Sequence, residues 1–164
     1  MMCKAVAVIL NCRFTVSITY HDSLHGFRLG RGMGIAPLKV KLLQNVAALG
    51  EAVLHVIFLE LHKAYNALYR SRCLDILEGY GLDPRDLRLL HRYWKRLKMV
   101  AQAGGYYGET FCRERGVTQG DPMLPTIFNV VVDTVVRHWE SLVVEREGGG
   151  VSAMTMETRC RRWG

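Results

Sequence analysis

The apolar run AVLHVIFLEL, residues 52–61, ends near a carboxylate at Glu60. Only His55 and Glu60 interrupt its apolar character, so the run predicts a strand that is buried on both faces. The short segment HKAYN, residues 62–66, follows it directly and favours a tight turn. The pattern therefore predicts a central strand with Glu60 at its end.

Helical and hairpin patterns surround this predicted strand. They predict helices over residues 37–49, 70–80, 84–98 and 122–146, and a hairpin over residues 100–113 around the sequence GGYYG. Before the helix at 84–98, Asp83 is a good helix cap and Pro84 a good first helical residue. Residues 25–34 hold four glycines and predict a loop. We therefore expect an α+β fold, with a small antiparallel sheet backed by helices.

Composition describes a folded, basic chain. Its 164 residues are 49% hydrophobic and 23% charged, and its net charge is +7, which favours polyanionic partners. The positive excess lies in residues 1–100, where 15 Lys and Arg accompany 7 Asp and Glu. We expect one domain over residues 1–147, which begins inside a hydrophobic element as if truncated. After the three glycines of 148–150, we expect a flexible tail over 148–164.

The five cysteines, at positions 3, 12, 73, 112 and 160, include no C-x-x-C pair. Their number and spacing suit neither a disulfide framework nor a zinc site, which predicts reduced thiols and an intracellular protein. The opening apolar stretch, residues 5–10, is much shorter than a membrane span. We expect no membrane association.

Three segments stand in an order typical of one enzyme family. FLELHKAYN, residues 58–66, resembles the first carboxylate motif of reverse transcriptases, F-x-D-L-x-K-A-[FY]-D. GVTQGDPMLP, residues 116–125, resembles their G-V-x-Q-G-x-x-x-S-P motif, and HGFRLGRG, residues 25–32, resembles the G-F-R-x-G-R loop of group II intron and related retroelement enzymes. The resemblance covers about residues 4–145.

This resemblance implies part of a right-hand polymerase palm with part of the fingers. It also implies RNA-directed DNA polymerase chemistry, in which two Mg²⁺ ions promote nucleotidyl transfer from a nucleotide triphosphate. The implied partners are an RNA template with a DNA primer, or an RNA–DNA duplex. The implied site residues are Glu60 as catalytic metal ligand, Tyr65 as a gate beside the sugar, Gln119 and Gly120 at the nucleotide and template, and Arg28 and Arg31 as nucleic-acid or nucleotide contacts.

The chain departs from the family pattern at the carboxylates. Glu60 stands where the family has aspartate, which adds a methylene at a site where Mg²⁺ demands near-octahedral geometry. Asn66 replaces the usual acid, and Leu124 replaces the serine before Pro125. No Asp-Asp pair occurs in the 164 residues, so the Y-x-D-D motif is missing. We expect a degenerate reverse transcriptase fragment that is inactive as this chain alone, or else a non-catalytic nucleic-acid binder or an inert product of gene decay.

The sequence RYWKRLK, residues 92–98, mixes cations with aromatic side chains. On a helix Arg92, Lys95 and Arg96 share one face at spacings of three and four residues, as contacts with backbone phosphates require, whereas Trp94 turns elsewhere. An ordinary solvated helix face is the alternative interpretation of the same cluster. Plain structural roles are likewise the alternatives for Glu60, Tyr65, Gln119 and the two loop arginines.

Overall fold

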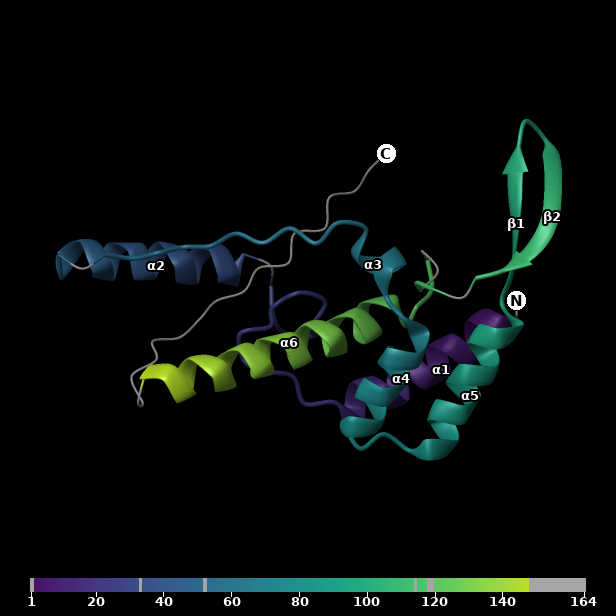
Figure 1. Ribbon diagram of the computed structural model, residues 1–164, viewed down its shortest axis with the longest axis horizontal. Coiled ribbons are helices and arrows are strands. Elements are labelled where there is room, and N and C mark those ends of the chain that lie inside the picture. Colours follow the sequence, from purple (N-terminus) through teal and green to yellow (C-terminus); the bar gives the residue numbers. More distant parts are fainter. Residues whose placement is uncertain (1, 33, 52, 114, 118–119, 148–164) are drawn as a thin grey trace. The chain divides into compact units, whose positions relative to one another are not determined.

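The computed structural model describes residues 2–32, 34–51, 53–113, 115–117 and 120–147 (Figure 1). In these residues the fold is α+β, as predicted, with six helices and one two-stranded antiparallel sheet. The elements are α1 (Met2–Ser17), α2 (Ile35–Leu49), α3 (Ala64–Ala67), α4 (Arg70–Gly79), α5 (Pro84–Arg96), β1 (Lys98–Ala103), β2 (Tyr106–Cys112) and α6 (Leu124–Glu147). The predicted tail over 148–164 lies outside the described residues.

The chain divides into two compact units. The described residues of Met1–Thr19 and Lys63–Val131 form the first unit, and those of Tyr20–His62 and of 132–147 form the second. Helix α6 therefore begins in the first unit and ends in the second. No helix in the described part of the chain is both long and apolar enough to cross a membrane.

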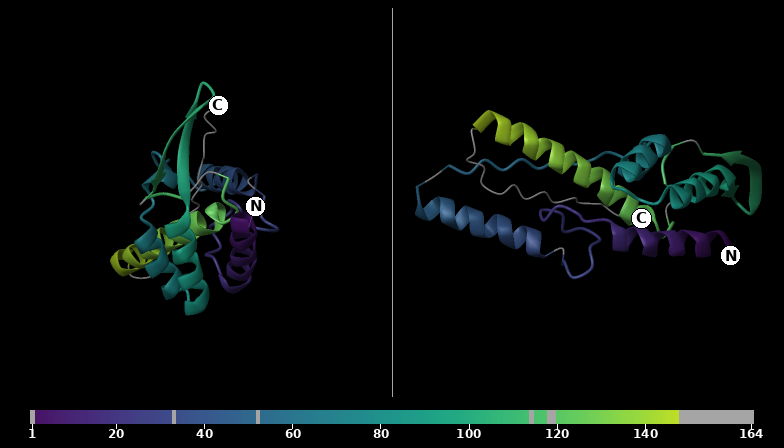
Figure 2. Two further views of the ribbon diagram at one scale, coloured as in Figure 1. Left: turned by 90° about the vertical axis from the view of Figure 1, so that its right-hand side faces the viewer. Right: turned by 90° about the horizontal axis from the view of Figure 1, so that it is seen from below.

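The core of the first unit is built on helix α5. Both α1 and α4 pack against this helix, and Figure 2 shows the three side by side. Leu10 of α1, Leu77 of α4 and Leu90 of α5 are almost completely shielded from solvent. At the edge of this core, the Arg13 guanidinium forms an ion pair of 2.9 Å with Asp86. Apolar burial on three helices therefore forms the core of this unit.

The start of α5 confirms the predicted capping. The Asp83 carboxylate accepts a hydrogen bond of 2.7 Å from the Arg85 N–H, and Pro84 is the first helical residue. Gly81 supplies a φ of 76° in the preceding turn, a conformation that is strained for residues with a Cβ. The sequence of this turn therefore fixes where α4 ends and α5 begins.

The predicted hairpin is also confirmed, and it is longer than expected. Lys98 pairs with Cys112 at its base and Ala103 with Tyr106 at its tip, on either side of a turn at Gly104 and Gly105. The pairing shifts by one residue between Val100 and Gln102, so β2 carries a bulge. Almost every residue of both strands is exposed.

The predicted central strand over residues 52–61 is wrong. Residues 53–61 adopt no regular secondary structure and are exposed, including Ile57 at 77% and Phe58 at 80%. A strand exists only if a neighbour accepts and donates its backbone hydrogen bonds. Within the described residues, no backbone hydrogen bond joins 53–61 to another segment. The composition is that of a strand, but the described part of the chain supplies no partner for it.

Helix α2 in the second unit begins two residues earlier than predicted and ends at Leu49 as predicted. Its apolar stripe, which includes Leu38, Leu42 and Val46, is exposed. Ala36 is the one residue of α2 that is fully buried. Together with residues 53–61, this stripe leaves the second unit with much uncovered apolar surface.

Candidate nucleotide and nucleic-acid site

Two of the three recognised motifs meet in the first unit. The Gly116 N–H donates a hydrogen bond of 2.7 Å to the Leu68 carbonyl, and the Val117 N–H donates one of 3.1 Å to the Tyr65 carbonyl. Gly116 has a φ of 77°, and a Cβ there would lie 3.0 Å from both the Tyr65 oxygen and the Asn66 Cα. Only glycine permits this approach, so the conformation of Gly116 sets the distance between the two motifs.

The side chains of Tyr65 and Asn66 both have partners at this junction. The Tyr65 ring meets the Phe128 ring edge to face, with centroids 5.0 Å apart. The Asn66 side-chain oxygen accepts a hydrogen bond of 2.8 Å from the Arg113 guanidinium. Gly120, in the middle of the second motif, is exposed with a φ of 83°. Gln119 lies outside the described residues, so its predicted role stays a prediction.

Arg70 fastens the same junction to the helices, a role that sequence reasoning missed. Its guanidinium donates to the carbonyls of Gly116 at 3.0 Å, Trp94 at 3.1 Å and Arg113 at 2.5 Å. It also lies over the Trp94 ring, 5.8 Å from the centroid. Burial lowers the pKa of this guanidinium from its usual value. No sequence signal marks the residue, because its three acceptors are backbone carbonyls far along the chain.

Asp121 within the second motif also has a structural role. Its carboxylate accepts hydrogen bonds of 2.9 Å from the Tyr93 hydroxyl and from the Met123 N–H, and its backbone carbonyl accepts one from the Leu124 N–H. The Asp121 side chain therefore joins this loop to α5. Its carbonyl accepts from the N–H of Leu124, the first residue of α6, which has no partner within the helix. The motif is thus anchored on both sides of Gly120.

The predicted cation cluster lies on the surface of α5. Arg92, Lys95 and Arg96 are exposed, whereas Trp94 is buried, so the predicted division of helix faces is confirmed. Among the described residues, none of the three cations forms an ion pair. They are therefore available to a polyanion, and contact with nucleic acid stays a prediction.

Arg28 and Arg31 both have partners within the loop between α1 and α2. The Arg28 guanidinium donates to the carbonyls of His21 at 2.7 Å and Leu24 at 3.0 Å. Arg31 pairs with the Asp22 carboxylate at 2.5 Å, and this hydrogen bond and positive charge lower the pKa of Asp22. These contacts give both arginines a role in shaping the loop. Nucleotide or nucleic-acid binding by them stays a prediction.

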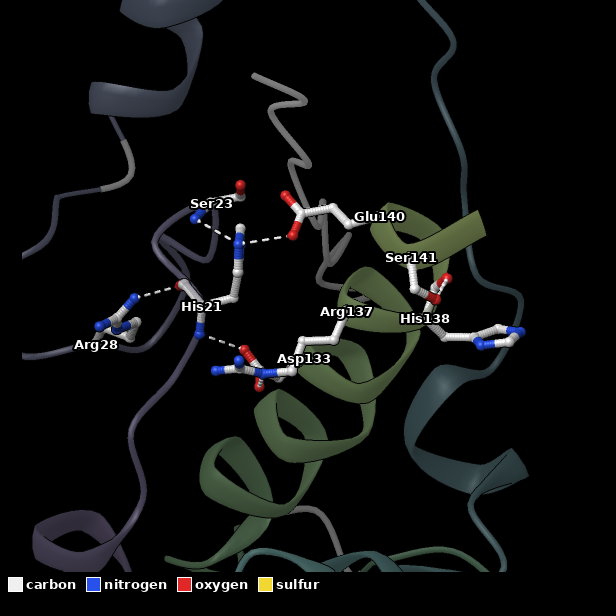
Figure 3. Close-up of polar contacts among 8 residues, drawn as sticks. All are labelled: His21, Ser23, Arg28, Asp133, Arg137, His138, Glu140 and Ser141. Carbon is white, nitrogen blue, oxygen red and sulfur yellow. Dashed lines mark hydrogen bonds and ion pairs between the residues drawn. The ribbon is translucent and has the colours of Figure 1, made fainter. Parts of the chain in front are cut away.

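His21 connects this loop to the part of α6 that belongs to the same unit (Figure 3). Its Nδ1 accepts a hydrogen bond from the Ser23 N–H, which leaves Nε2 as the nitrogen that carries a proton. This Nε2 lies 3.0 Å from a Glu140 carboxylate oxygen. The His21 backbone N–H donates to Asp133, a fully buried carboxylate that is also paired with Arg137 at 2.7 Å. The buried Asp133 carboxylate therefore accepts hydrogen bonds both from the loop and from its own helix.

Glu60 lies in the exposed segment of the second unit. Within the described part of the chain, no three His, Cys, Asp or Glu side chains gather as a metal site. Mg²⁺ takes several oxygen ligands in near-octahedral geometry, and Glu60 by itself supplies one carboxylate. The described residues therefore do not form a complete magnesium site.

Comparison with known proteins finds a resemblance to a polyprotein of a mobile genetic element. That protein is the retrovirus-related Pol polyprotein from type-2 retrotransposable element R2DM of Drosophila melanogaster, which is 24% identical over 149 residues. The alignment covers 91% of this chain and 14% of the polyprotein, so the chain spans about one seventh of that relative. No family model matches the chain. The match supports a retroelement relationship and does not concern a group II intron.

Proposed function

We propose that the chain is a reverse transcriptase-like segment of RNA-directed DNA polymerase lineage, related to retroelement Pol polyproteins. The observation that carries the proposal is the junction of Tyr65 and Asn66 with Gly116 and Val117. It unites two motifs that lie 50 residues apart in the sequence, and the similarity to a retrotransposon Pol polyprotein spans both. The first unit would then belong to a polymerase palm with part of the fingers. The group II intron part of the resemblance rests on residues 25–32 alone.

In this proposal the junction is the edge of a nucleotide site. Tyr65 has the role of sugar gate that the resemblance implies, and the contact of its ring with Phe128 supports this role by restricting the ring. Gln119 and Gly120 contact the nucleotide and the template. Glu60, in the second unit, stays the predicted metal ligand, and the described residues do not complete a magnesium site around it. The proposal therefore includes that the 164 residues alone do not polymerise.

Nucleic-acid binding is the part of the proposal that this chain can perform by itself. Arg92, Lys95 and Arg96 are exposed and lack ion pairs among the described residues, which favours contact with the phosphates of an RNA template or an RNA–DNA duplex. Each phosphate contact on a duplex contributes about −0.9 to the slope of log affinity against log salt. Three contacts should therefore contribute a slope of about −2.7.

Binding of an RNA–DNA duplex at several salt concentrations tests this part. Simultaneous replacement of Arg92, Lys95 and Arg96 by alanine should weaken binding and flatten the slope. Replacing Lys39 and Lys41 of α2 by alanine is the control for loss of general positive charge and should leave most of the slope intact. Affinity that does not change with salt would remove the proposal in favour of an inert chain.

Primer extension with Mg²⁺ and nucleotide triphosphates tests the catalytic part. The purified chain should incorporate no nucleotide, and Glu60→Asp alone should restore none, because one carboxylate cannot complete the metal site. Template-directed incorporation that is abolished by Glu60→Gln would contradict the inactivity of the chain. Salt-dependent binding without incorporation is the expected combined result.

A further inference from the structure

The tip of the β1–β2 hairpin exposes two adjacent aromatic side chains. Tyr106 is 84% exposed and Tyr107 is 73% exposed. Figures 1 and 2 show the hairpin standing out from the end of α5, with its tip away from the helices of the first unit. Aromatic rings contribute strongly to binding when a partner buries them, and both rings at this hairpin tip are accessible to one.

The bulge in β2 determines which way these rings face. Side chains alternate between the two faces of a strand, and β1 contains no extra residue. Tyr107 lies opposite Gln102 and therefore shares a face with Lys98, whereas Tyr106 lies opposite Ala103 and shares the other face with Phe111. The tip thus presents one aromatic ring on each side of a thin ribbon.

The surroundings of the hairpin in the sequence are strongly basic. Residues 84–115 contain eight Lys and Arg and three Asp and Glu. Of these acids, Asp86 is paired with Arg13. The cations Arg92, Lys95 and Arg96 lie at the end of α5, and Lys98 begins β1 two residues later. This charge is complementary to a phosphate backbone and unfavourable for a cationic partner.

We propose that the hairpin tip is a stacking platform for unpaired bases of single-stranded nucleic acid, whose phosphates contact the cations of α5. The inference rests on the proposed function only for the binding of nucleic acid by α5. Every base has a π-face that can stack on a tyrosine, and flanking cations bind the backbone. The bases of a duplex are already stacked on one another, so the tip selects single strands.

The dimensions set the length of the ligand. Six residues of β1 at about 3.3 Å each carry the tip about 20 Å from the end of α5. A strand that reaches both the tyrosines and the cations must therefore span several nucleotides, within the range of roughly 4–16 nucleotides that single-strand sites occupy. A 15-nucleotide oligouridine is a suitable probe.

Fluorescence anisotropy with this labelled oligouridine and with a 15-base-pair RNA–DNA duplex tests the inference. The double variant Tyr106→Ala, Tyr107→Ala should bind the single strand at least about 5-fold more weakly, since stacking of one base contributes about 1–3 kcal/mol. Its duplex affinity should change by less than about 2-fold. The double variant Tyr106→Phe, Tyr107→Phe should bind like the wild type, because stacking needs the ring and not the hydroxyl.

Two controls keep the result interpretable. Trp139→Ala removes an exposed aromatic of α6 and should leave single-strand binding unchanged. Circular dichroism should show that the alanine variant is folded, as expected for exposed positions. Unchanged single-strand binding by the alanine variant would overturn the inference, whereas duplex binding through α5 would still support the proposed function. Equal weakening for both ligands, or altered self-association with unchanged binding, would also overturn it. Absence of salt-dependent binding to either ligand by the wild type would overturn both.

Discussion

Gly116→Ala should destabilise the chain by about 2–4 kcal/mol. The φ of 77° costs a residue with a Cβ about 1–2 kcal/mol. The new Cβ would lie 3.0 Å from the Tyr65 oxygen and the Asn66 Cα. Both are backbone atoms that cannot rotate away, so the loop must shift. This shift weakens the hydrogen bonds from the Gly116 and Val117 N–H groups, each contributing about 0.5–1.5 kcal/mol.

Urea unfolding followed by tryptophan fluorescence measures this loss. With a denaturant slope of about 2 kcal/mol per molar urea, in the middle of the range for small proteins, the midpoint should fall by about 1–2 M. Gly120→Ala is the matched control. Gly120 has a φ of 83° but no atom within 4 Å of a new Cβ, so it should show only the conformational cost. Equal destabilisation by the two substitutions would refute the close approach of the two motifs at Gly116.

Three substitutions or reagents test the packing of the first unit. Leu90→Ala should lower the free energy of unfolding in urea by about 2–5 kcal/mol because Leu90 is fully buried. Leu89 is exposed, so Leu89→Ala should lower it by less than about 1 kcal/mol. Similar losses for the two variants would contradict the packing of α5. Asp83→Ala should lower stability by about 1 kcal/mol through loss of the α5 cap, and an unchanged midpoint would show that the cap is dispensable. Burial raises the pKa of Cys73 to about 11. After iodoacetamide treatment at pH 8, mass spectrometry should therefore find Cys73 unmodified and the exposed Cys12 modified. Rapid modification of Cys73 in the folded chain would contradict its burial.

The parts of the fold that the sequence predicts correctly are those with local causes. Asp83 and Pro84 act within one helical turn, and Gly104 and Gly105 act within one hairpin turn. Their effects do not depend on distant segments, so their positions in the sequence are sufficient. The strand prediction for residues 52–61 failed because a strand depends on a partner, and composition does not show whether that partner exists.

The candidate site shows the same division. The motifs direct attention to Tyr65 and Gly116, which the fold brings together, and their predicted roles stay predictions. Helical spacing predicted the exposed face of Arg92. Arg70 could not be predicted, because its acceptors at residues 94, 113 and 116 come together only in the folded chain. Asp121 lay inside a recognised motif, but its hydrogen bond to Tyr93 needs the packing of that loop against α5.

The uncovered apolar segment over residues 53–61 has a consequence for handling the protein. Within the described residues its backbone groups have no hydrogen-bond partner in another segment, and its run is nearly continuously apolar, with Glu60 as the one Asp, Glu, Lys or Arg in it. Such segments promote edge-to-edge association of chains and the growth of insoluble β-rich aggregates. We expect yields of soluble material to fall steeply with concentration, and a charged substitution such as Ile57→Lys to improve recovery without loss of the α5-centred core.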